Sequence, residues 1–317
     1  MLKILQSGEV RNAAQGCPAH QMRMALPTAV TQLEGRHPCY SFTAEGHNRV
    51  GRLHLPVSPA CNIQCRFCQR DFNSTELRPG VAQRLIAPEE APDVVARALE
   101  LCPAIGVIGI AGPGDTLATI HALRTFALVH ERFPQLINCL STNGLLLEEK
   151  AEQIVAAGVK TVTVTVNAVD PFVLDKICSS VVYRGKKLSG MDAANLLIVK
   201  QLAGIRRITE LGAVVKVNTV LVPGINDKHI EAVAKIVSEA GASLINVIPL
   251  IPQYELSYVV PPDFIQLSEA RRSAENHLNV FTHCNRCRAD ACGIPGENDY
   301  SSELYGRPMA EATFSHG

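Results

Sequence analysis

The sequence contains no tryptophan, and aromatic residues make up only 5% of its 317 positions. Its 30 basic residues balance 30 acidic ones, so no net charge argues for nucleic acid or an anionic membrane as a partner. No apolar run approaches the roughly 20 residues that a membrane helix needs, and the opening MLKILQSGEVRN lacks the apolar region of a signal peptide. These absences predict a cytoplasmic protein with a small substrate.

The apolar pattern predicts one large α/β domain. From residue 52 onward, short apolar runs alternate with segments of helical periodicity, as in βα units around a parallel sheet. Strands are expected at 52–57, 104–110, 136–141, 161–166, 213–220 and 243–249, and helices at 88–102, 116–132, 147–157, 190–210, 227–240 and 265–278. Six repeats that stop short of eight predict a partial (β/α)6 barrel of the TIM type, with its site at the carboxyl ends of the strands.

The two ends of the chain lie outside these repeats. Residues 1–36 are predicted to form an N-terminal extension and residues 297–317 a C-terminal tail, around a barrel domain of residues 37–296. The insert at 183–190, YRGKKLSG, is expected to form a mobile loop near the mouth of the barrel.

Eleven cysteines are many for a protein of a reducing compartment, where clustered thiols indicate metal ligation or catalysis rather than disulfides. Six of them stand out by spacing or context: Cys61, Cys65, Cys68, Cys284, Cys287 and Cys39. The other five are expected to be small buried hydrophobes: Cys17, Cys102, Cys139, Cys178 and Cys292.

Three cysteines, Cys61, Cys65 and Cys68, follow the first predicted strand with the spacing C-x3-C-x2-C. Three thiolates on one loop can hold three irons of a cubane cluster and leave the fourth iron open to a substrate. With the aromatic Phe67 just before the last cysteine, this motif resembles the radical S-adenosylmethionine (SAM) superfamily. The resemblance implies a [4Fe–4S] cluster whose open iron binds SAM and whose electron cleaves it.

Later strand ends carry residues that suit such a SAM site. Gly112, Gly114 and Asp115 follow the second predicted strand, where the superfamily holds the methionine amino group with a glycine-rich turn. Ser141 and Asn143 follow the third strand and Asn167 ends the fourth, and these side chains can hydrogen-bond a carboxylate or a ribose. Each motif alone is an ordinary turn sequence; their recurrence at successive strand ends indicates a site.

Longer stretches resemble the NifB family of nitrogenase-cofactor maturases, in a short form without the C-terminal carrier domain. They are the segments 37–39 (HPC), 52–65 (RLHLPVSPACNIQC), 78–81 (RPGV), 111–115 (AGPGD), 139–144 (CLSTNG), 201–207 (QLAGIRR) and 284–290 (CNRCRAD). This resemblance implies a radical SAM maturase that fuses two [4Fe–4S] clusters with a SAM-derived carbide into the core precursor of the nitrogenase cofactor. It also implies an iron–sulfur cluster donor, an electron donor such as a ferredoxin or flavodoxin, and a cofactor carrier protein as partners.

The resemblance implies two auxiliary cluster sites beside the SAM site. For the first, Cys284 and Cys287 in C-x2-C, with Cys39 from the N-terminal segment, supply three thiolates, and His54 adds an imidazole. A zinc site is the rival interpretation of the C-x2-C pair, and His37 is a weaker candidate ligand.

The second auxiliary site departs from the family pattern. Where family members carry a cysteine followed by Val-Asn-Glu-Ser-Arg-Pro-Gly, this sequence is one residue shorter and has Ser74, a poor iron ligand. Cys139 and Glu76 remain as candidate ligands for that cluster, and Cys292 is expected to be spare.

The departure at Ser74 leaves three interpretations open. The protein is a complete maturase with a more loosely bound second cluster, a radical SAM enzyme with one auxiliary cluster and another substrate, or a carrier of iron–sulfur clusters. Arg70 and Arg78, near the triad, are candidates for balancing the charge of anionic clusters.

Overall fold

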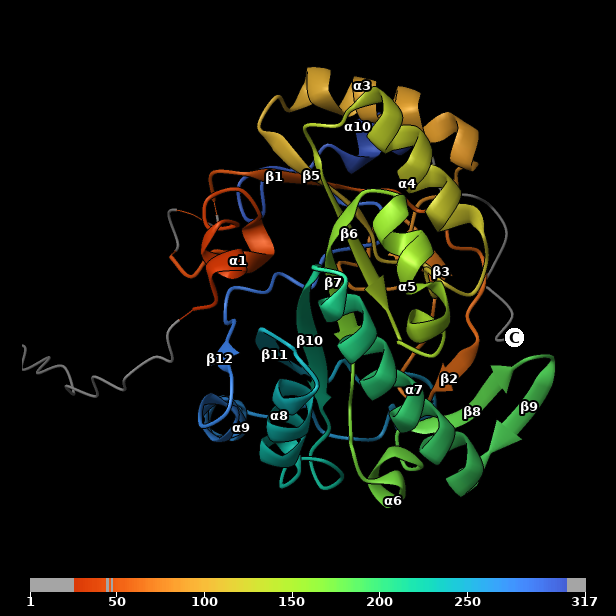
Figure 1. Ribbon diagram of the computed structural model, residues 1–317, viewed down its shortest axis with the longest axis vertical. Helices are drawn as coiled ribbons and strands as arrows, with labels where there is room; N and C mark the ends of the chain where they lie inside the picture. The colour runs from red at the N-terminus through yellow and green to blue at the C-terminus, as the bar shows by residue number, and fades with distance from the viewer. Residues whose placement is uncertain (1–25, 44–45, 47, 307–317) are drawn as a thin grey trace, which may run out of the picture.

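The structure, a computed structural model, describes residues 26–43, 46 and 48–306, so Cys17 and most of the predicted N-terminal extension lie outside the described residues. Its core is an eight-stranded sheet in the order β12-β11-β10-β7-β6-β5-β1-β13 (Figure 1). The strands, in that order, are Asn279–Val280, Leu244–Pro249, Val214–Leu221, Val159–Thr165, Ile137–Thr142, Ile105–Ile110, Gly51–His54 and Cys292–Gly293.

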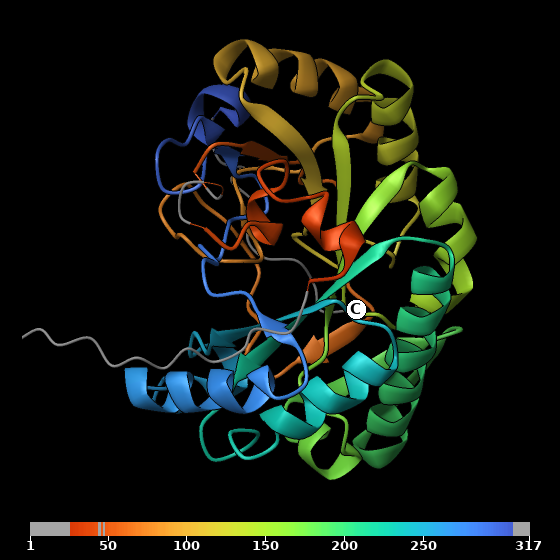
Figure 2. The same cartoon turned by 60° about the vertical axis from the view of Figure 1, so that its left-hand side comes forward.

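The predicted partial barrel is confirmed. The six predicted strands are present as β1, β5, β6, β7, β10 and β11, and neighbours among them pair in parallel. Each is followed by a predicted helix: α3 (Ala91–Leu101), α4 (His121–Arg132), α5 (Leu147–Ala156), α7 (Gly190–Glu210), α8 (Ile230–Glu239) and α9 (Phe264–Glu275). The barrel stays open, because no pairing in the described part of the chain joins β12 to β13. Figure 2 shows the helices in an arc outside the curved sheet.

The alternation of side chains along the strands separates a dry outer layer from a polar interior. Outward-facing strand residues such as Leu53, Ile108 and Val215 are buried in the apolar layer against the helices. The alternate residues face the barrel interior, and many of them are polar or cysteine: His54, Cys139, Ser141, Thr161, Thr163, Lys216, Asn218 and Asn246. Barrel interiors are usually packed with branched apolar side chains, so this interior is built for another purpose.

The amino-terminal end of the barrel is closed by the chain's own N-terminal segment. The helix α1 (Thr28–Thr31) and the short helix η1 (Pro38–Tyr40) carry apolar side chains onto the first inward-facing layer of the strands. Tyr40 is fully buried and its hydroxyl donates to the carbonyl of Val214 at 3.4 Å. Figure 2 shows this red segment inside the arc of strands. We call this N-terminal segment, residues 26–43, the floor of the barrel; it brings Cys39 into the interior.

The expectation of a mobile loop at 183–190 was wrong, because residues 183–189 belong to a β-hairpin and Gly190 begins α7. Strands β8 (Cys178–Tyr183) and β9 (Lys186–Ser189) pair antiparallel across Arg184 and Gly185. Both turn residues have positive φ, 49° and 76°, as a two-residue type I′ turn requires. β8 also pairs with β2 (Ile63–Cys65), so the hairpin fastens the loop that carries the cysteine triad.

The C-terminal residues complete the other edge of the sheet. β13 pairs antiparallel with β1, and α10 (Ser301–Tyr305) follows. Tyr305 is buried and its hydroxyl donates to the carbonyl of His54 at 2.6 Å. The first part of the predicted tail therefore packs on the barrel, whereas residues 307–317 lie outside the described residues. No described helix is long and apolar enough to cross a membrane.

Helix α7 is held close to α5 by a glycine. A Cβ atom at Gly204 would lie 2.7 Å from the Cβ of Leu147 and 3.0 Å from the amide nitrogen of Glu148, and backbone cannot yield as a flexible side chain can. One turn earlier on α7, Gln201 donates to the carbonyls of Asn143 (2.8 Å) and Thr165 (2.9 Å) at the ends of two strands. The close packing of α7 thus supports the strand ends.

We expect Gly204→Val to lower the free energy of unfolding by roughly 1–3 kcal/mol, because the added methyl groups overpack the α5–α7 contact. Urea denaturation followed by circular dichroism measures this. Val199→Ala, at a 62% exposed position on the same helix, should change that free energy by no more than about 0.5 kcal/mol. Wild-type stability of the Gly204 variant would show that the helices separate without cost.

Candidate functional site

A cavity of about 270 Å³ lies at the carboxyl ends of the parallel strands. All three triad cysteines line it, and so do most of the residues predicted for the SAM site: Phe67, Gly114, Asp115, Ser141, Asn143 and Asn167. Gly112 is absent from the described lining, although its neighbours Ala111 and Pro113 belong to it. The structure thus brings the motifs of four successive strand ends into one cavity.

The thiols of the triad loop point into the cavity, in surroundings that are largely shielded from solvent. Burial raises the pKa of the Cys61 thiol to about 11. Burial acts to lower the pKa of the neighbouring Arg70, but the charges of the triad cysteines outweigh it and the pKa is raised. The three triad cysteines stay partly accessible. The side chain of Arg70 is buried, and its Nη1 atom has no hydrogen-bond partner. An unpartnered guanidinium nitrogen beside three thiols fits an anionic iron–sulfur cluster, whose irons displace the thiol protons on binding.

Asp115 ties the turn after β5 to the carboxyl end of β6. Its carboxylate accepts hydrogen bonds from the amides of Asn143 (2.6 Å) and Leu117 (3.0 Å) and from the hydroxyl of Thr142 (3.0 Å). Burial nevertheless raises its pKa, against the opposing effect of these hydrogen bonds. Because both carboxylate oxygens are already engaged, the geometry favours a role in orienting the turns.

The glycine turn and the triad loop touch through their backbones. The amide of Gly114 donates to the carbonyl of Ser58 and that of Asp115 to the carbonyl of Ala60, both at 2.8 Å. A Cβ atom at Gly114 would overlap the carbonyl of Ala60, so only glycine allows this approach. Asn143 extends the contact, since its side-chain amide donates to Asn62 at 2.7 Å.

Among the cavity-lining residues with no role predicted from the sequence are Cys178, Gln201 and Arg286. Cys178 lies opposite Cys65 in the β2–β8 ladder, and the two thiols hydrogen-bond. This pairing depends on the hairpin, so no local spacing signals it.

Asn167 was predicted to hydrogen-bond a carboxylate or a ribose. Its side-chain oxygen instead joins two strands, because it accepts from the amide of Val220 at 2.9 Å.

A second group of cysteines lies in the barrel interior. Cys39 is close enough to Cys139, Cys284 and Cys287 for their charges to act on its pKa, which burial raises to about 12. Cys139 comes from β6, Cys39 from the floor and the C-x2-C pair from the segment after β12. Among the described residues, no three His, Cys, Asp or Glu side chains are arranged to hold a single metal ion.

The loop that carries the C-x2-C pair borders both groups of cysteines. Arg286, between Cys284 and Cys287, lines the triad cavity. On β10, Lys216 lies near the interior cysteines and Asn218, two residues further on and on the same face, lines the triad cavity. The two groups are therefore successive layers along one barrel axis.

His54 has one ring nitrogen available to a metal. Its Nδ1 lies 2.8 Å from the carbonyl oxygen of Arg288, which can only accept, so Nδ1 carries the proton and Nε2 a lone pair. Burial lowers the pKa of His54 to about 4, which keeps the ring neutral. The ring lies against Gly109 of the neighbouring strand, where a Cβ atom would overlap it.

His37, the weaker candidate, has no such lone pair to offer. Its Nδ1 accepts from the amide of Cys39 at 3.1 Å, which leaves the proton on Nε2, 3.4 Å from the hydroxyl of Thr161. Cys292 pairs with β1 and is buried in the apolar layer. The contacts of His37 and Cys292 therefore stabilise the fold, and neither residue is placed as an iron ligand.

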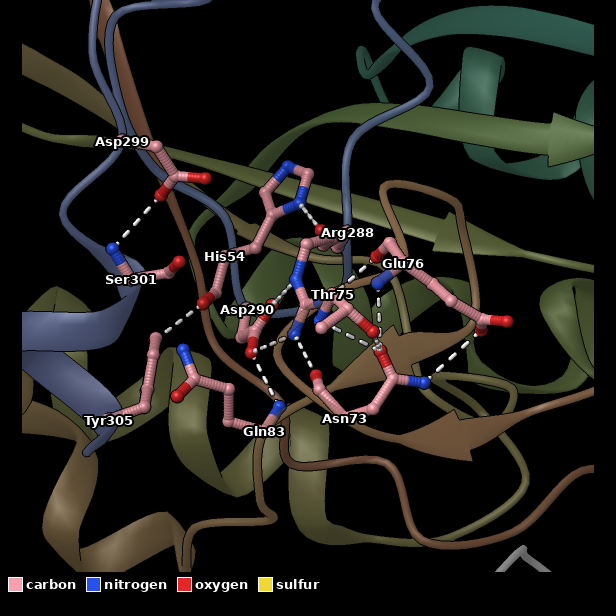
Figure 3. A network of polar contacts seen from close by, with 10 residues as sticks. All are labelled: His54, Asn73, Thr75, Glu76, Gln83, Arg288, Asp290, Asp299, Ser301 and Tyr305. Carbon is pink, nitrogen blue, oxygen red and sulfur yellow. Dashed lines mark hydrogen bonds and ion pairs between the residues drawn. The ribbon is translucent and has the colours of Figure 1, made fainter. Parts of the chain in front are cut away.

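A buried ion pair ties the loop of Ser74 and Glu76 to the C-terminal segment (Figure 3). Arg288 pairs with Asp290 at 2.8 Å and donates to the carbonyls of Asn73 (2.6 Å) and Glu76 (2.7 Å). The carboxylate of Glu76 pairs with Arg78 at 2.6 Å. Ser74 is exposed, and the structure groups Cys139 with the interior cysteines rather than with Glu76.

Comparison with known proteins identifies the family. Residues 55–237 match the radical SAM superfamily. The chain is 41% identical to the FeMo cofactor biosynthesis protein NifB of Methanocaldococcus infernus over 271 residues, which are 85% of this chain and 89% of that protein. It is also 41% identical to the protein of that name from Klebsiella pneumoniae, over 91% of this chain and 63% of the longer relative.

Solved structures share the fold at low sequence identity. Streptococcus suis SuiB superposes with a TM-score of 0.53 at 13% identity, over 74% of this chain and 49% of its own. A radical SAM methyltransferase from Sphaerobacter thermophilus gives 0.50 at 18% identity, over 73% and 64%. The chain belongs to the radical SAM superfamily and, within it, to the NifB family.

Proposed function

We propose that the protein is a radical SAM maturase that fuses two [4Fe–4S] clusters, through a carbide derived from SAM, into the core precursor of the nitrogenase cofactor. The observation that carries this proposal is the stacking of two cysteine groups along one barrel axis, with the loop of Cys284 and Cys287 bordering both. A maturase needs such an arrangement, because its cluster substrate must lie beside bound SAM.

In the triad cavity, Cys61, Cys65 and Cys68 would hold the catalytic [4Fe–4S] cluster, and the strand-end turns would hold SAM. When bound, this pair supplies reductive SAM cleavage, hydrogen abstraction and a methyl group. The chain's own residues bind and orient: Asp115 fixes the turns, and Arg70 offers its free Nη1 to the anionic group. Phe67 and the other apolar lining residues exclude water.

In the interior, Cys39, Cys284, Cys287 and the Nε2 atom of His54 would hold a substrate cluster. Cys139 lies with them, and Glu76 would serve a second substrate cluster only after leaving Arg78. Ser74 favours a second candidate function, namely a radical SAM enzyme with a single auxiliary cluster and another substrate. The number of clusters separates the two candidates.

We further propose a cytoplasmic location and three protein partners: an iron–sulfur cluster donor, an electron donor such as a ferredoxin or flavodoxin, and a carrier that accepts the product. The location is supported by free thiols throughout the described chain, which need a reducing compartment. The partners are supported by the chemistry, which consumes clusters and electrons and releases a cluster.

Anaerobic reconstitution followed by iron analysis tests this function. We expect about twelve irons per wild-type chain, three clusters of four, and release of 5′-deoxyadenosine. About eight irons that rise toward twelve in Ser74→Cys would support the single-auxiliary enzyme instead. Thr75→Cys, at the adjacent exposed position, is the matched control and should leave the count unchanged. About four irons, held by the triad alone, would contradict both candidates.

Asp115→Ala should weaken SAM binding roughly tenfold or more, because Thr142 and the amides of Asn143 and Leu117 lose their shared acceptor. Iron content should stay that of the wild type, since no iron ligand is removed. Anaerobic titration calorimetry measures the affinity, and Asp93→Ala, in an exposed ion pair on α3, is the control. Loss of triad iron in the Asp115 variant would show that the carboxylate supports the cluster itself.

A further inference from the structure

Lys216 lies inside the barrel, where a lysine is unusual. It is the third residue of β10 and is only 4% exposed. Its ammonium lies 5.5 Å from the ring centre of Tyr40 and 5.2 Å from that of Phe281, so aromatic faces cover it on the floor side and beside β12. The side chain is therefore held in place and shielded from water.

No carboxylate of the described residues lies within ion-pair distance of this ammonium. The groups near it are the thiol of Cys39, with which it hydrogen-bonds, the thiols of Cys284 and Cys139, and the neutral imidazoles of His37 and His54. None of these is a carboxylate. A buried cation without an anion is costly, and folded proteins seldom keep one. The missing anion must therefore come from what the interior binds.

The position of Lys216 also selects the kind of anion. It shares its layer with Cys139 and lies next to the Cys39 thiol, and one layer further along the axis Asn218 lines the triad cavity. Asn218 accepts a hydrogen bond from Asn246 at 3.1 Å, which closes the wall beside it. An anion here is surrounded by cysteine sulfur and faces the SAM cavity, as an iron–sulfur cluster ligated by thiolates would be.

We propose that Lys216 is the electrostatic anchor of the substrate cluster: its ammonium neutralises the thiolate-ligated cluster and positions it beneath the SAM cavity. This inference rests on the proposed function. An ionic anchor suits cargo that must leave, because it holds the cluster without a bond to iron. His54 would complete the ligand set through its Nε2 atom, and an imidazole ligand adds no negative charge to the cluster.

The test compares reconstituted wild-type protein with Lys216→Met, which keeps the length and removes the charge, and with Lys216→Arg, which keeps the charge. Lys200→Met is the matched control, because Lys200 pairs with Glu148 and Glu149 on the outer helices. We measure iron per chain, the rate at which a chelator removes iron, and the change that SAM causes in the paramagnetic resonance signal of the triad cluster. We also measure the Tm of each metal-free protein.

In Lys216→Met, we expect iron outside the triad to be lost to the chelator roughly tenfold faster than in the wild type. The SAM-dependent signal of the triad should persist. Lys216→Arg should behave like the wild type, and Lys200→Met should too. Metal-free Lys216→Met should melt at a higher temperature than the metal-free wild type, because an uncompensated buried charge has gone. If the Met variant does not fold, Lys216→Gln replaces it with the same expectations for iron.

Wild-type chelation kinetics in Lys216→Met, with full iron, would overturn the anchor while leaving the proposed function intact. A lower Tm in metal-free Lys216→Met would overturn it as well, since the lysine would then be a structural group. Wild-type protein that holds no iron outside the triad would overturn the proposed function and the anchor together.

Discussion

The fold depends on the apolar contact between the outer faces of its strands and the surrounding helices, which leaves the inner faces free to carry polar side chains. Outward-facing residues such as Leu53 and Val215 form the apolar layer with the helices, and this layer can stabilise the sheet by itself. The inward-facing residues are thereby freed from packing, and Cys139, Thr161 and Lys216 occupy positions that a closed TIM barrel fills with branched apolar side chains. The barrel interior can therefore bind a polar ligand.

A polar barrel interior must still be shielded from solvent, and the first and last described segments of the chain both contribute to this. The N-terminal segment seals the floor with Tyr40 and delivers Cys39. The C-terminal segment pairs β13 with β1, orients His54 through the carbonyl of Arg288, and delivers Cys284 and Cys287. The two segments that close the barrel thus also carry the candidate ligands, which explains why the interior thiols come from distant parts of the sequence.

The sequence predicted the features that depend on local pattern. The strand from Ile137 to Thr142 and the triad motif could be placed because periodicity and spacing are local properties. The hairpin around Gly185 could not be predicted, because its pairing with β2 is a long-range contact that the Lys-rich stretch does not signal. The role of Cys178 beside Cys65 follows from that same pairing.

The interior site could be predicted only in part. The motifs named Cys39, Cys284 and Cys287, but Cys139 and Glu76 were assigned together to another cluster, and the structure shows Cys139 beside Cys39 and Glu76 paired with Arg78. Lys216 stood out in no motif, since one lysine in a strand carries no signal until its burial is known. The ligand assignments stay predictions until metal is measured.

The most direct test of a two-layer maturase follows the methyl carbon of SAM. Protein reconstituted with iron and sulfide is turned over with methyl-13C SAM under reduction, and its interior cluster is examined by pulsed paramagnetic resonance. We expect a 13C hyperfine coupling in the signal of the interior iron–sulfur product. A product signal without 13C coupling, in protein that has formed 5′-deoxyadenosine, would contradict the two-layer maturase.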